Sequence, residues 1–132
     1  MNKIIIAILA AIALIGGLAM FGNGSEAEKG AEQMTFATVQ QDVANGAKFY
    51  DVRTAQEYNE GRFENAVNWS LQDIEAGKLP DVPKDTKIYV HCQSGNRSGQ
   101  ATTILKNAGY TNVVDLGGLA DVETIGGTLI TQ

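Results

Sequence analysis

The chain has 132 residues, with fifteen acidic side chains against ten basic ones and a formal net charge of −5. This balance argues against nucleic-acid binding, because neutralising phosphates requires an excess of Lys and Arg. Once the apolar N-terminus is set aside, about 100 residues are left, which is enough for one modest hydrophobic core and therefore one domain.

An uncharged apolar run covers residues 4–21, after Lys3 and before a polar stretch. A basic start followed by an apolar block is typical of a secretory signal, yet the run is also just long enough to span a bilayer as a helix. We therefore expect residues 1–24 to be a cleaved signal peptide or a membrane anchor whose N-terminus stays inside. A polar linker over 25–34 then leads to an exported, periplasmic or otherwise extracytoplasmic domain over 35–132.

Short helical and β-prone segments alternate after the linker. The predicted elements of the first half are a helix over 38–45, a strand over 48–52, a helix from 54 to about 61, a strand over 66–68 and a helix over 71–76. The second of these helices is the best marked, because Thr54 and Glu57 have the spacing of a capping box.

In the second half, a strand over 87–91 is followed by a small, polar turn. A helix is predicted to begin at Ser98, with apolar residues at helical spacing, and to end at Gly109. The last predicted strand covers 112–116. This alternation indicates an α/β fold with a small parallel sheet flanked by helices on both faces, preceded by the N-terminal apolar helix.

The one cysteine, Cys92, directly follows a predicted strand. An exported chain with a lone cysteine cannot form an internal disulfide, so the thiol is either a buried core residue or free for chemistry. In α/β sheets, ligands bind at the carboxyl ends of the strands, and a helix N-terminus presents free N–H groups there. A loop of this kind favours the thiolate and could hold a persulfide or a sulfonate. The loop residues expected to bind such anions are Gln93, Ser94, Gly95, Asn96 and Ser98, with Arg97 adding a positive charge.

Three segments resemble the rhodanese family, and they occur in the family's order. They are residues 50–53 with Glu57, Tyr58 and Gly61, residues 92–98, and residues 108–118. Within the family, the chain is most similar to small exported single-domain sulfurtransferases. The sequence departs from the family at 61–66, where Gly-His-Ile-Pro-Gly-Ala is common, and after Gly118, where an aromatic residue is usual.

The resemblance implies a thiosulfate sulfurtransferase that works by a ping-pong reaction. Cys92 would attack a donor such as thiosulfate, keep the sulfur as a persulfide and pass it to a thiol or cyanide, with Arg97 as the second catalytic residue. Loop N–H groups would stabilise the anions, and Asp51 and Arg53 would support the loop. No cofactor and no metal are implied. Membrane anchoring through 4–21 stays open, as does the identity of any protein acceptor.

The same loop is compatible with two other hypotheses about function. In cysteine phosphatases, five residues separate the cysteine from the arginine, whereas here four residues separate Cys92 from Arg97, so the cradle is small for a phosphate monoester. Alternatively, the domain could be a persulfide carrier or a sulfur-sensing module that serves one protein partner. His91 is expected to point away from Cys92, because adjacent side chains on a strand face opposite sides.

Overall fold

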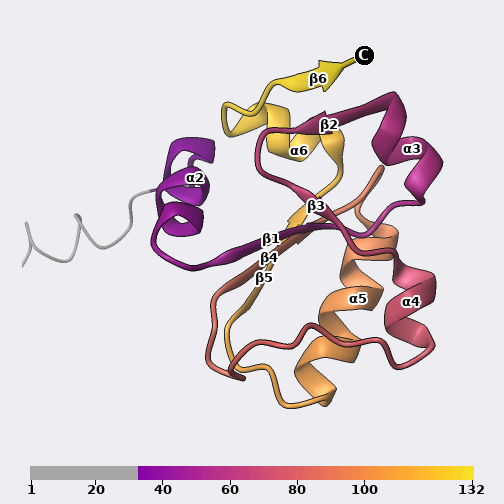
Figure 1. Ribbon diagram of the computed structural model, residues 1–132. Helices are drawn as coiled ribbons and strands as arrows, with labels where there is room; N and C mark the ends of the chain where they lie inside the picture. The colour runs from indigo at the N-terminus through magenta and orange to yellow at the C-terminus, as the bar shows by residue number, and fades with distance from the viewer. Residues whose placement is uncertain (1–32) are drawn as a thin grey trace, which may run out of the picture. The chain divides into compact units, whose positions relative to one another are not determined.

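The computed structural model describes residues 33–132, and Met34–Gln132 form one compact unit (Figure 1). The expected signal peptide or anchor and nearly all of the expected linker lie outside the described residues. Within 33–132, no helix is both long enough and apolar enough to cross a membrane.

A four-stranded parallel sheet forms the centre of this unit. Its strands, in spatial order, are β3 (Val67–Asn68), β1 (Lys48–Asp51), β4 (Ile88–His91) and β5 (Val113–Gly117). The helices are α2 (Phe36–Ala44), α3 (Ala55–Glu60), α4 (Leu71–Glu75), α5 (Asn96–Asn107) and α6 (Leu119–Thr124). A separate antiparallel pair joins β2 (Gly61–Phe63) to β6 (Leu129–Thr131). The expected α/β fold with a parallel sheet is confirmed.

Two hydrophobic clusters lie on opposite faces of the sheet, because successive strand residues point to opposite sides. Tyr50 and Val90 belong to the cluster that includes residues of α4 and α5, whereas Phe49 and Tyr89 belong to the cluster that includes residues of α2 and α6. Figure 1 shows these helix pairs on the two sides of the sheet. Helices therefore cover both faces, as the alternating pattern predicted.

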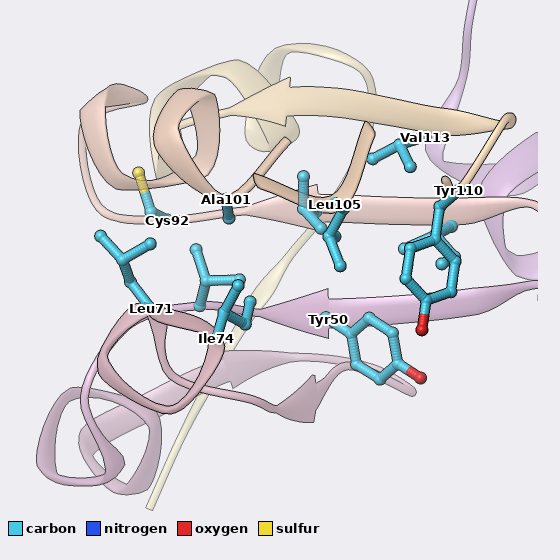
Figure 2. Close-up of a cluster of buried hydrophobic side chains, with 11 residues drawn as sticks. Tyr50, Leu71, Ile74, Cys92, Ala101, Leu105, Tyr110 and Val113 are labelled. Carbon is cyan, nitrogen blue, oxygen red and sulfur yellow. The ribbon is translucent and has the colours of Figure 1, made fainter. Parts of the chain in front are cut away.

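Cys92 lies at one end of the first cluster, as Figure 2 shows, with Tyr50 and Tyr110 at the other end. The residue has no exposed surface, and its apolar neighbours include Ala101 of α5. The cysteine is thus both a core residue and the first residue of the loop that follows β4.

Two helices begin earlier than the sequence indicated. The first, α2, starts at Phe36, two residues before the predicted start. The hydroxyl of Thr35 accepts a hydrogen bond from the N–H of Thr38 and so caps the helix there. Likewise, α5 starts at Asn96 instead of Ser98, because Gly95 adopts a φ of 101° and turns the chain directly into the helix.

The prediction that the strand over 112–116 is the last strand was wrong. After β5 the chain forms α6 and then β6, which pairs with β2 over Gly61–Phe63. The partner strand lies about 70 residues earlier in the chain, and β6 has only three residues, so no local periodicity marks it. The pairing closes the structure over the face that carries α2 and α6.

Candidate active site

The sheet register brings together the polar residues that follow β1 and β4. Asp51 is paired with His91 in the register of these two strands, so Cys92 and Val52 lie side by side just beyond the strand ends. The N–H of Val52 donates to the carbonyl of His91, and the N–H of Cys92 donates to the carbonyl of Gly117 on β5. The sulfur therefore sits at the carboxyl edge of the sheet, where the sequence placed it.

Hydrogen-bond donors of the next turn converge on the sulfur. The N–H of Gly95 donates to Cys92 Sγ at 2.9 Å, and Ser98 Oγ lies 3.5 Å from the same atom. Burial acts to raise the pKa of the Cys92 thiol, but contacts with the Ser98 hydroxyl and with the N–H groups of Ser98, Gly95 and Ser94 outweigh it, so the pKa is lowered. The loop thus favours the thiolate, the form of cysteine that acts as a nucleophile.

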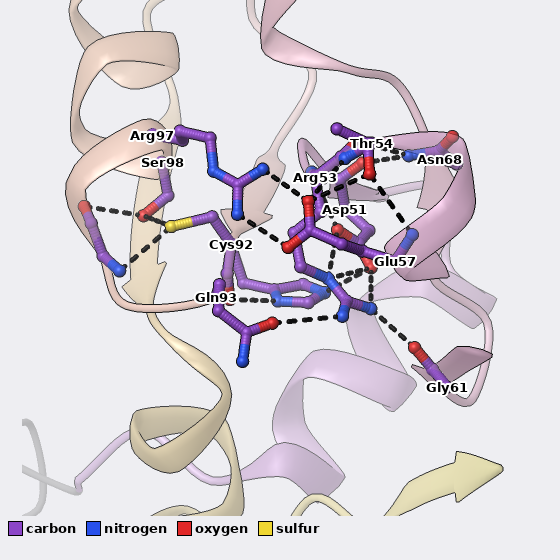
Figure 3. Close-up of polar contacts among 12 residues, drawn as sticks. Asp51, Arg53, Thr54, Glu57, Gly61, Asn68, Cys92, Gln93, Arg97 and Ser98 are labelled. Carbon is purple, nitrogen blue, oxygen red and sulfur yellow. Dashed lines mark hydrogen bonds and ion pairs between the residues drawn. The ribbon is translucent and has the colours of Figure 1, made fainter. Parts of the chain in front are cut away.

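Arg97 does not direct its guanidinium at the sulfur. Its two terminal nitrogens donate to Glu57 Oε1 at 2.6 Å and to Oε2 at 2.8 Å, which joins α5 to α3 (Figure 3). This hydrogen-bonded pair lowers the pKa of the Glu57 carboxyl to about 2 and raises that of Arg97. The positive charge expected beside the loop is present, and a carboxylate compensates it.

Asp51 and Arg53 form a second, buried ion pair beneath the loop. Arg53 Nε lies 3.0 Å from both carboxylate oxygens of Asp51, and Arg53 Nη2 lies 2.7 Å from Oδ2. The same Nη2 donates to the carbonyl of Gly61 at 2.6 Å, while Nη1 reaches Gln93 Oε1 at 3.4 Å. Gln93 is the first residue after Cys92, so Arg53 contacts the loop at its beginning. The sequence predicted this position, beside the loop, for Asp51 and Arg53.

The segment that follows β5 holds the other side of the loop. Ser94 and Gly118 form an isolated antiparallel bridge, and the N–H of Leu119 donates to the carbonyl of Gln93 at 3.0 Å. A Cβ atom at Gly118 would lie 2.7 Å from that carbonyl oxygen and 2.8 Å from the Cα of Ser94. Only glycine allows such a close approach of the two backbones.

His91 points away from the sulfur, as expected for adjacent strand residues. Its ring packs against Phe49 and Phe63 on the opposite face, and its Nε2 lies 3.5 Å from Asp51 Oδ2. Burial lowers the pKa of His91, although Asp51 acts in the other direction. The imidazole is thus a buried core group and not a base for Cys92.

Two clefts flank the Arg97–Glu57 ion pair. One, of about 210 Å³, is lined by Arg53, Glu57, Glu60, Gly61, Gln93, Leu119 and Leu129. The other, of about 220 Å³, is lined by Val52, Thr54, Ser70, Leu71, Gln72 and Arg97. The first cleft meets the Cys92 loop at Gln93, and the second meets it at Arg97. Within 33–132, no group of three His, Cys, Asp or Glu side chains is placed to hold a metal ion.

Most of the candidate residues lie together around the loop, but they differ in whether they contact the sulfur. Gly95 and Ser98 contact the sulfur, Ser94 contributes its backbone, and Gln93 turns its side chain towards Arg53. The side chain of Asn96 instead accepts a hydrogen bond from Gln100 on the surface of α5.

Two residues of the site were not predicted to belong to it. Glu57 was predicted as a capping residue and as part of a family-like segment, without a role at the site. It does accept from the N–H of Thr54 at 3.2 Å, but the same carboxylate also binds Arg97, forty positions further on. Gly118 belonged to a family-like segment without an assigned role. The contact of Gly118 with the loop is a tertiary feature that no local signal indicates.

The model of the rhodanese-like domain family matches residues 35–123, and the chain belongs to this family. It is 37% identical over 73 residues to the thiosulfate sulfurtransferase PspE of Escherichia coli (strain K12), covering 54% of this chain and 70% of that protein. It is 43% identical over 70 residues to the adenylyltransferase and sulfurtransferase uba4 of Ogataea parapolymorpha, covering 52% of this chain but 18% of that protein.

Among solved structures, the described unit is similar to a rhodanese with anions from E. coli. The TM-score is 0.54 at 32% sequence identity, and the match covers 66% of this chain and all of the other. The recognition of the rhodanese family from the three sequence segments is thereby confirmed.

Proposed function

We propose that this protein is a rhodanese-type sulfurtransferase that moves sulfane sulfur from thiosulfate, or a similar donor, to a thiol or cyanide. One observation carries the proposal: Cys92 Sγ lies in a turn whose donors converge on it, with the N–H of Gly95 at 2.9 Å. Such an arrangement stabilises a thiolate and, equally, the anionic persulfide that would follow. The similarity to a protein named thiosulfate sulfurtransferase supports thiosulfate as the donor class.

In the first half-reaction, the Cys92 thiolate attacks the outer sulfur of thiosulfate. A new S–S bond forms at Cys92, the S–S bond of thiosulfate breaks, and sulfite leaves with the bonding electron pair. In the second, a thiolate or cyanide attacks the outer sulfur and Cys92 leaves as the thiolate. No resolving cysteine is required, which agrees with the presence of one cysteine in the chain.

The remaining site residues have positioning roles in this proposal. Glu57 holds Arg97 beside the loop, and Asp51 holds Arg53 so that it reaches Gln93. Gly118 keeps the loop backbone in place from the other side. None of these groups needs to exchange a proton during sulfur transfer.

Steady-state formation of thiocyanate from thiosulfate and cyanide tests the proposal on the full chain. We expect parallel double-reciprocal plots, as a ping-pong reaction requires, and no turnover for Cys92→Ser. Persulfides and mercaptopyruvate are the next donors if thiosulfate is inactive, and failure with every donor would refute the sulfurtransferase. If the protein forms the persulfide but transfers its sulfur to no small acceptor, it is a persulfide carrier instead.

We also propose that the protein acts outside the cytoplasm. The support is the apolar run over 4–21 behind Lys3, which lies outside the described residues. Fractionation of cells that express the full chain tests this, because a cytoplasmic location would contradict it.

A further inference from the structure

Both arginines beside the Cys92 loop have their charge compensated. Arg97 is bound by Glu57 through two hydrogen bonds, and Arg53 is bound by the fully buried Asp51. Arg62 of β2 lies over the ring of Tyr58, 5.0 Å from its centroid, and does not line either cleft. The two clefts that flank the loop therefore contain no uncompensated positive side chain.

One negative charge in this region has no such partner. Glu60 is exposed at the end of α3 and lines the cleft that also contains Gln93. Its Oε1 accepts a hydrogen bond from the amide of Gln56 at 3.3 Å, and no Lys or Arg within 33–132 lies at ion-pair distance from it. In the second cleft, Arg97 is the one charged residue of the lining, and Glu57 neutralises it.

We propose that this cleft selects the sulfur acceptor by charge and that Glu60 sets the selection, so that thiols with a positive charge or none are preferred over thiols that carry a carboxylate. The inference rests on the proposed function, because it concerns the second half-reaction of the same site. Glu60 and the anionic persulfide both repel an incoming anion, and no free cation in either cleft offsets them.

The step itself is a sulfur transfer between thiolates. The acceptor thiolate attacks the outer sulfur of the Cys92 persulfide, a new S–S bond forms on the acceptor, and the S–S bond to Cys92 breaks. The electron pair of that bond stays on Cys92, which leaves as the thiolate. No oxidant or reductant is consumed, so the acceptor charge affects approach and not the balance of the reaction.

Single-turnover transfer from the full-length protein tests this inference. The persulfide is loaded with inorganic polysulfide, so that loading does not depend on which donor the enzyme prefers. Rate constants are then measured with cysteamine, 2-mercaptoethanol and 3-mercaptopropionate as cationic, neutral and anionic acceptors. Each rate is compared between the wild type and Glu60→Gln, because this ratio cancels the intrinsic reactivity of each thiol. Glu75→Gln is the matched control, since Glu75 is exposed on α4 and lines neither cleft.

For Glu60→Gln we expect the rate with 3-mercaptopropionate to rise about two- to five-fold relative to the rate with cysteamine, because the attacking thiolates differ in net charge and one screened negative charge of the cleft is removed. The rate with 2-mercaptoethanol, whose attacking thiolate carries one negative charge, should change by an intermediate factor, and Glu75→Gln should leave all three rates unchanged. Equal ratios for all three acceptors would overturn the charge selection while leaving the sulfurtransferase intact. Transfer to none of the three thiols by the wild type would overturn the charge selection, and failure of cyanide to remove the sulfur as well would overturn the sulfurtransferase.

Discussion

At the scale of single residues, the chemistry of Cys92 is decided by two opposing effects. The side chain has no exposed surface, and burial acts against the thiolate. The contacts from Ser98, Gly95 and Ser94 act in the other direction and are stronger together, so the pKa is lowered. A cysteine in the same core position without this turn would be an inert apolar group.

The pH dependence of alkylation by iodoacetamide checks this account. We expect the midpoint for Cys92 to lie below the ordinary thiol value of about 8.5, and to move upward in Ser98→Ala because a contact to the sulfur is lost. Thr103→Ala is the control, since that hydroxyl donates to the carbonyl of Gly99 further along α5. A midpoint at or above the ordinary value in the wild type would contradict the account.

At the scale of elements, the shape of the Cys92 loop depends on the connection between β5 and α6. Gly118 contacts the backbone of Gln93 and Ser94 so closely that any side chain at this position must displace one of them. Gly117 has a φ of 86° and accepts from the N–H of Cys92, so the same connection also fixes the start of the loop. The loop and the β5–α6 connection are in this sense one unit.

Gly118→Ala tests this dependence. We predict a loss of about 1–3 kcal/mol in the free energy of unfolding, the usual cost of overpacking, together with slower persulfide formation. Gly99→Ala is the matched control, because its Cβ would meet only Asp115 at 3.7 Å and glycine inside a helix costs about 0.5–1 kcal/mol relative to alanine. Urea denaturation should therefore show opposite signs for the two variants. Equal stability of Gly118→Ala and wild type would show that the loop is not held in this way.

The elements that could be predicted from the sequence are those with local signals. The capping box of Thr54 and Glu57 gave α3, and the apolar spacing of α5 gave its buried face, although its start was set by the φ of Gly95. The pairing of β6 with β2 could not be predicted, because it joins distant segments and involves strands of three residues each.

The same distinction applies to the site. The position of Cys92 followed from the strand before it and the helix after it, and the family-like segments placed Asp51 and Arg53 nearby. The pairing of Arg97 with Glu57 could not be foreseen, because both residues already had local interpretations and nothing in the sequence links positions forty apart. The catalytic roles assigned to Cys92 and Arg97 stay predictions until transfer is measured.

At the scale of the whole molecule, the sheet separates two environments that share one polar edge. Cys92 lies in the cluster on the α4–α5 face, while His91, its neighbour in the chain, lies among Phe49 and Phe63 on the other face. His91 is the one histidine of the chain, it is fully buried, and burial lowers its pKa. Folding therefore favours the neutral imidazole.

This burial predicts how stability changes with pH. A histidine whose pKa is lower in the folded chain gains its proton more readily on unfolding, so the free energy of unfolding falls as pH drops below the unfolded value of about 6.5. The decrease continues down to the lowered pKa, with a slope of at most about 1.4 kcal/mol per pH unit for one proton. Urea denaturation near neutral pH, and again about one to two pH units lower, measures this decrease in the free energy of unfolding. The Cys92→Ser variant is used because it removes the thiol, whose own titration would otherwise contribute. Equal stability at both pH values would show that His91 is not held neutral.

Every role proposed for the site depends on sulfur residing on Cys92. The most direct measurement is the intact mass of the full chain after incubation with thiosulfate, beside Cys92→Ser treated in the same way. We predict a gain of one sulfur atom in the wild type, none in the variant, and its removal by cyanide with formation of thiocyanate. An unmodified wild-type protein after thiosulfate, persulfides and mercaptopyruvate would contradict the sulfurtransferase and leave a binding module of the rhodanese fold.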